Sequence, residues 1–235
     1  MEHALASAHR DARLRLLALG ESLTAAQAAT LTTACPEWSI KDVYAHLAGI
    51  STDILSGNTE NAATVEWADG HVADRGERSF SEVLAEWADA GAQVDELLMS
   101  VGEAFPFQLF IDQWTHEWDV RAGLGEVAAV VPDLSVCEFV ADELGASMGE
   151  RAPSSSGALK IVVGERAWTV GEGAEVGELA LDPFTFTRVA MGRRSHGQML
   201  ALPWPATVTE PVLWFDALVV WSVNGVDVVD PVLPG

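Results

Sequence analysis

An aspartate and a histidine four residues apart are the side chains of this sequence best placed to do chemistry together. They are Asp112 and His116, in the segment FIDQWTHEWDV at residues 110–120. Residues with this spacing on a helix project from one face, about 6 Å apart. A carboxylate oxygen and an imidazole nitrogen held in this way could share one metal ion.

A third candidate ligand is His46, in the segment CPEWSIKDVYAHLAG at residues 35–49. On a helical wheel it lies about 40° from Ile50, at the margin of an apolar stripe that faces a helix bundle. Two imidazoles and one carboxylate suit a divalent cation such as zinc, and leave a coordination position for water or a substrate atom. We therefore predict a catalytic metal site formed by His46, Asp112 and His116.

Simpler interpretations exist for the same residues. Asp112 and His116 could be a polar pair that only stabilises its helix, and His46 could be a hydrogen-bonded core residue. The other histidines stand in polar or terminal contexts, so we expect solvent exposure for His3, His9, His71 and His196. Cys35 and Cys137 have no adjacent histidine or basic residue in the sequence, and we expect both to be structural.

Helical periodicity predicts the elements that would position these side chains. We expect helices at residues 4–19, after Ser39, after Ser79, after Pro106 and from about 133 to 148, with a further short turn of helix between residues 21 and 38. Ser39 with Asp42 and Ser79 with Glu82 are typical of capping boxes. Residues 58–78 look like a polar loop. Long helices with short connections predict a four-helix bundle over residues 1–150.

The core faces of two helices can be read from apolar residues at three- and four-residue steps. After Ser39 they are Ile40, Val43, Leu47, Ile50 and Ile54, and after Ser79 they are Val83, Trp87, Ala90, Val94, Leu97 and Val101. Both series predict buried stripes. Trp114 and Trp118 flank the predicted ligands, where they could pack the bundle or line a dry pocket.

The composition changes after the last predicted helix. Residues 151–157, RAPSSSG, are small and polar and indicate a linker. Residues 158–235 then contain two β-rich runs around Gly164, followed by a strand, a turn and a helix, and an apolar end that would complete a second core. The predicted fold class is α followed by α/β: a helical bundle and a small α+β domain.

Charge and cysteine content exclude several functions. Thirteen Lys and Arg residues against 35 Asp and Glu residues give a net charge of -22, which repels nucleic acid and anionic membranes. Two cysteines, no secretory leader and no apolar run of membrane-spanning length favour a cytoplasmic protein. We expect the partner to be a small molecule or another protein. Arg193 and Arg194 could end a helix in solvent, or Arg193 could bind a substrate carboxylate.

Three segments together resemble a known family. They are CPEWSIKDVYAHLAG, DQWTHEWDVRAGLG and the later RAWTVGEG with MGRRS, and they are similar to the mycothiol-dependent maleylpyruvate isomerase family, which is related to the DinB-like metal-binding bundles. The resemblance implies a divalent metal, commonly zinc, at His46, Asp112 and His116, and a C-terminal domain that helps form the substrate pocket. Aspartate stands at position 112 where the family commonly has glutamate.

The resemblance also implies a cofactor thiol. A metal-bound thiol loses its proton and can attack an electrophilic carbon, and no cysteine of the chain adjoins the predicted ligands in sequence. We therefore expect a low-molecular-weight thiol such as mycothiol, and an isomerase or S-transferase acting on a small electrophile. The alternatives are a metal-dependent hydrolase with water in place of the thiol, or a non-enzymatic ligand-binding protein with a structural metal.

Overall fold

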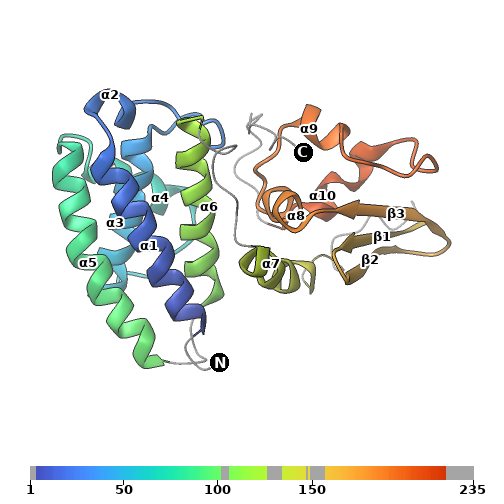
Figure 1. The fold of residues 1–235 in the computed structure, drawn as a ribbon, viewed down its shortest axis with the longest axis horizontal. Helices are drawn as coiled ribbons and strands as arrows, with labels where there is room; N and C mark the ends of the chain where they lie inside the picture. The colour runs from blue at the N-terminus through green and yellow to red at the C-terminus, as the bar shows by residue number, and fades with distance from the viewer. Residues whose placement is uncertain (1–3, 102–105, 126–133, 147, 149–156, 221–235) are drawn as a thin grey trace. The chain divides into compact units, whose positions relative to one another are not determined.

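The chain forms two compact units, residues 1–127 and residues 128–235, in a computed structural model that describes residues 4–101, 106–125, 134–146, 148 and 157–220. The described part of the first unit is helical, whereas the second unit combines a three-stranded sheet with helices (Figure 1). The predicted fold class, α followed by α/β, is confirmed.

Four long helices build the first unit: α1 (Ala4–Ser22), α3 (Ile40–Ser56), α5 (Phe80–Val101) and α6 (Phe107–Gly123). They enclose a common core, because α1 and α3 each pack against both α5 and α6 (Figure 1). Buried side chains from these helices, including Leu16, Tyr44 and Trp87, form one apolar cluster. The short helix α2 (Ala25–Ala28) is the expected turn of helix in the connection.

The predicted helix starts are confirmed at two capping boxes. The Asp42 amide donates to Ser39 Oγ at 3.2 Å, and the Ser39 amide donates to Asp42 Oδ2 at 2.9 Å. The same reciprocal pair joins Ser79 and Glu82 at 3.3 and 2.8 Å. Each pair satisfies amides that have no partner within the helix. These local contacts fix where α3 and α5 begin.

Two expectations about the first unit are wrong. Residues 58–78 are not only a loop, because they contain helix α4 (Val65–Asp74), which packs against α3. Its N-cap is Thr64, and the residue that α4 buries is the polar His71, so an apolar stripe does not mark its buried face. On α5, Leu97 is 43 % exposed and Leu98 is buried, because the core stripe takes a four-residue step after Val94.

The second unit is built around a small mixed sheet. It contains α7 (Leu134–Ala146), β1 (Gly157–Val163), β2 (Arg166–Glu172), β3 (Glu175–Leu181), α8 (Pro183–Ala190), α9 (His196–Leu200), a 3-10 helix (Pro211–Trp214) and α10 (Phe215–Leu218). The strand order is β2-β1-β3, with β1 antiparallel to β2 and parallel to β3. The predicted hairpin and the predicted strand, turn and helix correspond to β1–β2 and β3–α8.

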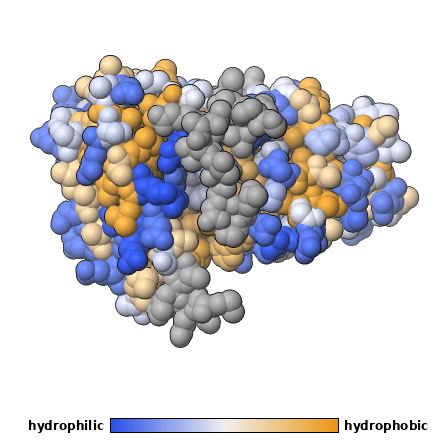
Figure 2. Space-filling view, in the orientation of Figure 1, coloured by the Kyte–Doolittle hydropathy of each residue, from blue (hydrophilic) through white to orange (hydrophobic). Residues whose placement is uncertain are grey.

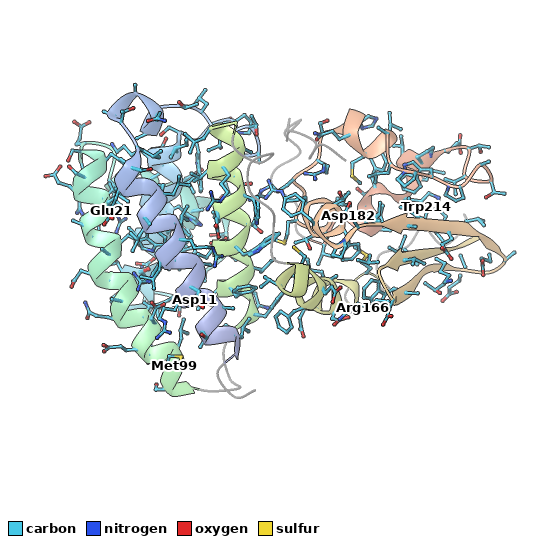
Figure 3. All side chains as sticks on the ribbon, viewed as in Figure 1. Asp11, Glu21, Met99, Arg166, Asp182 and Trp214 are labelled. Atoms are coloured by element: carbon cyan, nitrogen blue, oxygen red, sulfur yellow. The ribbon has the colours of Figure 1, made fainter. Side chains whose placement is uncertain are left out.

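Helix α7 belongs to this second unit, although we expected it in the bundle of residues 1–150. It packs against α8 and β2. Arg166 on β2 forms ion pairs with Glu138 and Asp142 of α7, and Figure 3 shows Arg166 beside that helix. An amphipathic stripe shows that a helix has a partner but does not say which core supplies it. The division after residue 127 therefore differs from the expected one at 151–157.

Parts of the predicted junction and of the C-terminal end lie outside the described residues. Of the expected linker 151–157, only Gly157 is described, and it begins β1. Of the apolar end, residues 221–235 are not described. Trp214, Ala217 and Leu218 before them are buried, as expected for residues that help complete the second core.

Polar and apolar residues share the surface that Figure 2 presents, where hydrophilic and hydrophobic side chains are interspersed. In the described parts of the chain, each helix is either too short or too polar to cross a membrane.

Candidate metal centre

Three donor side chains from two helices converge in the first unit. His46 comes from α3, and Asp112 and His116 come from adjacent turns of α6. His46 Nε2 lies 3.7 Å from Asp112 Oδ2, and His116 Nε2 lies 3.7 Å from Asp112 Oδ1. The ligand atoms of all three residues lie within 4.8 Å of one another. The structure thus brings together the three residues chosen from the sequence.

The separations within this cluster suit a shared cation. At 3.7 Å, an imidazole nitrogen and a carboxylate oxygen are farther apart than in an ordinary hydrogen bond. Two ligand atoms bound tetrahedrally to one zinc ion, with bonds of about 2.1 Å, would lie ~3.4 Å apart. Two imidazoles and a carboxylate are also a donor set that zinc accepts. The residues present therefore fit a divalent metal.

The surroundings keep one imidazole in its metal-binding form. His46 is only 4 % exposed, and burial lowers its pKa, although the Asp112 carboxylate acts in the opposite direction. A neutral imidazole carries the nitrogen lone pair that binds metal. Asp112 differs from both histidines because 37 % of its side chain is exposed. It is the member of the cluster that solvent or a ligand can reach.

A carboxylate supports the outer nitrogen of His116. Asp119 Oδ2 lies 3.0 Å from His116 Nδ1, and the side chain of Asp119 is fully buried. The Cys35 thiol donates to the same oxygen at 3.7 Å. Metal-binding histidines usually donate their second N–H in this way, which fixes the ring. With Nδ1 committed to Asp119, His116 Nε2 points to the cluster.

A second histidine supports the outer nitrogen of His46. His71 Nδ1 lies 3.2 Å from His46 Nδ1, and His71 Nε2 lies 3.0 Å from Asp53 Oδ2. His71 is buried at 5 % exposure, so the expectation that it is solvated is wrong. The missed helix α4 explains the error. A signal was present, since Trp67 and His71 are four residues apart after Thr64, a good N-cap residue.

Indole rings enclose the imidazoles. Trp38 lies 5.1 Å from the His46 ring and 6.1 Å from the His116 ring, measured between centroids. Trp67 lies 6.1 Å from the His46 ring and 4.2 Å from the His71 ring. Apolar walls of this kind limit water and strengthen electrostatic interactions inside a site. Trp114 and Trp118, which we expected either to pack the bundle or to line a dry pocket, are both buried.

A second group of possible metal ligands shares His116. It consists of Cys35, His116 and Asp119, all buried, with ligand atoms within the same 4.8 Å limit. Its atoms already hydrogen-bond to one another through Asp119. Only the first group includes a partly exposed ligand, so a substrate atom could reach the open coordination position that a catalytic metal requires. Cys35 was expected to be structural because no histidine or basic residue adjoins it in the sequence. In the folded protein it lies beside His116 and Asp119.

A small cavity lies beside Asp112 in the first unit. It is lined mostly by apolar side chains of α3, α5 and α6, with polar atoms from α1, α3 and α6. The lining residues are His9, Leu47, Ile50, Ser51, Ile54, Val94, Leu109, Asp112 and Gln113. This arrangement provides an apolar recess next to the most accessible ligand.

The remaining candidates fall outside this cluster. Arg193 belongs to the second unit, is 5 % exposed and donates from Nη1 to the Met191 carbonyl at 2.9 Å. It is therefore not a solvated helix end, and its role in binding a substrate carboxylate stays a prediction. His9 is buried beside Asp95, against expectation, whereas His196 is exposed as expected. His3 lies outside the described residues.

Comparisons with known proteins bear on the first unit. Neither the curated proteins nor the solved structures gave a match. The family model described as the mycothiol maleylpyruvate isomerase N-terminal domain matches residues 9–129, about half of the chain, including all three donors of the cluster. The chain belongs to the mycothiol maleylpyruvate isomerase N-terminal domain family.

Proposed function

We propose that this protein is a metal-dependent enzyme that uses a low-molecular-weight thiol, mycothiol or one like it, to isomerise or S-conjugate a small electrophile. The observation that carries the proposal is the convergence of His46 Nε2, His116 Nε2 and Asp112 at mutual distances that suit one cation. The family name supplies the thiol and the reaction class.

The metal-binding half of the proposal depends on how the donors are held. Both histidines are buried and have their Nδ1 atoms engaged by neighbours, which leaves the Nε2 lone pairs for the cation. A divalent cation bound there would lower the pKa of a coordinated thiol, so that a thiolate forms at neutral pH. Because 37 % of the Asp112 side chain is exposed, the thiol would approach from its side of the cluster.

The cavity beside Asp112 has a volume of about 10 Å³, room for roughly one water molecule, so it would have to widen to take a small substrate. Leu47, Ile50, Ile54 and Leu109 offer apolar contacts there, and Ser51 and Gln113 offer polar ones. Apolar walls with a few placed polar groups are typical of small-molecule sites. The partly buried indoles of Trp38 and Trp67 would limit the access of water to the cluster, which would protect the electrophilic acceptor from competing hydrolysis.

Metal analysis of variants tests the binding step. We expect one equivalent of zinc per wild-type chain after dialysis, and a large loss of zinc in His46→Ala, Asp112→Ala and His116→Ala. Cys35→Ser is the matched control, because Cys35 belongs only to the second ligand group. Retention of zinc in His46→Ala together with its loss in Cys35→Ser would move the metal to Cys35, His116 and Asp119 and refute the proposed centre.

Turnover with and without added thiol tests the reaction. The zinc-loaded protein should convert maleylpyruvate or a simple electrophilic acceptor only when mycothiol is present, and Asp112→Ala should abolish this activity. Hydrolysis of an ester or amide without thiol would favour the hydrolase. Zinc binding without any turnover across thiols and acceptors would favour a ligand-binding protein.

A further inference from the structure

We propose that His71 and Asp53 are positioning residues, which hold the His46 ring in the orientation and tautomer that directs Nε2 to Asp112 and His116. The inference rests on the metal site of the proposed function and extends it. The two residues come from different helices, α4 and α3, and act through His46.

The geometry forms an unbroken chain of short contacts. Asp53 Oδ2 lies 3.0 Å from His71 Nε2, and His71 Nδ1 lies 3.2 Å from His46 Nδ1. Asp53 is itself fixed, because Trp67 Nε1 donates to Oδ2 at 2.6 Å and Asn58 Nδ2 donates to Oδ1 at 3.0 Å. The side chains of both histidines are at most 6 % exposed. Water competes little with these contacts.

This series of contacts selects one tautomer for each neutral ring. A carboxylate only accepts hydrogen bonds, so Asp53 requires the proton of His71 on Nε2. His71 Nδ1 then carries a lone pair and accepts from His46 Nδ1–H. His46 Nε2 is left with its lone pair, 3.7 Å from Asp112 Oδ2. The tautomer of His46 that satisfies its contact with His71 therefore presents the unprotonated Nε2 that a metal ligand requires.

Helix α3 contains a space that admits the His71 ring. Gly49 lies one turn after His46, and a Cβ atom at this position would fall 2.2 Å from His71 Cγ. Glycine inside a helix is less favourable than alanine, so this residue weakens α3 locally. What it allows is close approach of the imidazole to the α3 backbone. The position of His71 therefore depends both on α4, which carries it, and on α3, where Gly49 leaves room for its ring.

Helix α4 is also held at its C-terminal end. Arg75 donates from Nη1 to the His71 carbonyl at 3.1 Å and pairs with Glu86 of α5 at 2.6 Å. With Trp67 joined to Asp53 on α3, these contacts tie α4 to two helices of the bundle. His71 therefore has little freedom to leave His46, which is the property a positioning residue needs.

Zinc and cobalt affinities of His71 variants test the proposal. We expect His71→Phe, which keeps a ring but removes both contacts, to weaken binding about 10–100-fold, the range typical of lost outer-sphere partners. It should also alter the visible absorption spectrum of bound Co²⁺. His71→Gln can donate to Asp53 and accept from His46, so it should recover part of the loss. Tyr44→Phe removes another buried hydrogen bond of α3 and should leave affinity unchanged.

A pair of glycine variants tests the same point without altering a polar group. Gly49→Ala should displace the His71 ring and weaken metal binding, although alanine favours the helix. Gly70→Ala is the matched control on α4, since a Cβ there meets nothing within 4 Å, and it should keep wild-type affinity. These two variants, with His71→Gln, decide the question if His71→Phe does not fold.

Histidine tautomers measured by ¹⁵N NMR on the metal-free protein separate this inference from the proposed function. At a pH where both rings are neutral, we expect His46 to carry its proton on Nδ1 in the wild type, and to lose this preference in His71→Phe. If the wild type binds no metal, the proposed function is wrong, but the tautomer measurement still tests the positioning role. Wild-type metal affinity and an unchanged His46 tautomer in a folded His71→Phe or Gly49→Ala protein would overturn the positioning role.

Discussion

Asp119 Oδ2 and His116 Nδ1 lie 3.0 Å apart, one turn of α6 from each other, with the Asp119 side chain fully buried. The contact gives His116 the partner that a metal-binding histidine usually has, a carboxylate that receives its second N–H. His46 reaches its carboxylate only through a second imidazole. The two histidines of the candidate centre are therefore supported in different ways.

Asp119→Asn should weaken zinc binding about 10–100-fold, because an amide holds the imidazole N–H less strongly than a carboxylate and can turn its NH₂ group towards the ring instead. Competition with a chromophoric chelator measures the change. Asp11→Asn on the exposed side of α1 is the control (Figure 3). Equal affinities in the two variants would mean that Asp119 does not orient His116.

Thr64→Ala should loosen α4 in particular. Thr64 Oγ1 accepts from the Trp67 amide at 3.2 Å, and losing such a cap costs about 1 kcal/mol. Hydrogen exchange of the amides of residues 65–74 should become roughly fivefold faster. Thr24→Ala removes the equivalent cap of α2 and should leave exchange in α4 unchanged. If both variants accelerate α4 alike, the cap at Thr64 does not hold this helix.

Asp95 should make the first unit sensitive to acid. Burial raises the pKa of this carboxyl, but hydrogen bonds from His9 and Arg13 outweigh burial and hold the pKa below its ordinary value. A lowered folded pKa means that the ionised carboxylate stabilises the fold above the unfolded value, about 3.9. This contribution is lost as the pH falls through the folded pKa.

Asp95→Asn should therefore lower the free energy of unfolding by about 3 kcal/mol at neutral pH, because it leaves Arg13 buried without its carboxylate. Urea unfolding at several pH values measures this loss. The difference between wild type and variant should narrow once the pH is well below 4, where the wild-type carboxyl is also neutral. A difference that stays constant across that range would show that ionisation of Asp95 contributes nothing.

Gly145→Ala should destabilise the second unit and leave the first intact. A Cβ at Gly145 would lie 2.2 Å from the Trp168 ring, so α7 must move away from β2, at a cost of about 1–3 kcal/mol as in other overpacked cores. Thermal unfolding should show the loss, and zinc affinity should not change. Reduced zinc affinity with an unaltered second unit would instead indicate that α7 supports the bundle.

The candidate centre was partly readable from the sequence because some of its geometry is local. Asp112 and His116 are one helical turn apart, so any helix through them places both donors on one face. The N-caps at Ser39 and Ser79 likewise depend on residues only three positions away. The helical wheel then placed His46 at the margin of an apolar stripe and the family resemblance supported it as a ligand, but no local rule contains its approach to α6.

Other parts of the centre could not be predicted, because they depend on contacts between distant elements. His71 and Asp53 are 18 residues apart in the chain and meet only when α4 packs on α3. Cys35 and Asp119 are 84 residues apart. Because the buried face of α4 is polar, neither this helix nor the burial of His71 was predicted from the sequence.

The long helices, the hairpin, the acidic composition and the pair Asp112–His116 could be predicted from short segments, since each follows from side-chain periodicity, turn chemistry or charge. The packing of α7 in the second unit, the approach of His46 to the other two donors and the contact of His71 with His46 became visible in the folded protein. The physical reason is that periodicity fixes which face of a helix is buried, whereas the partner of that face is chosen by the packing of whole elements.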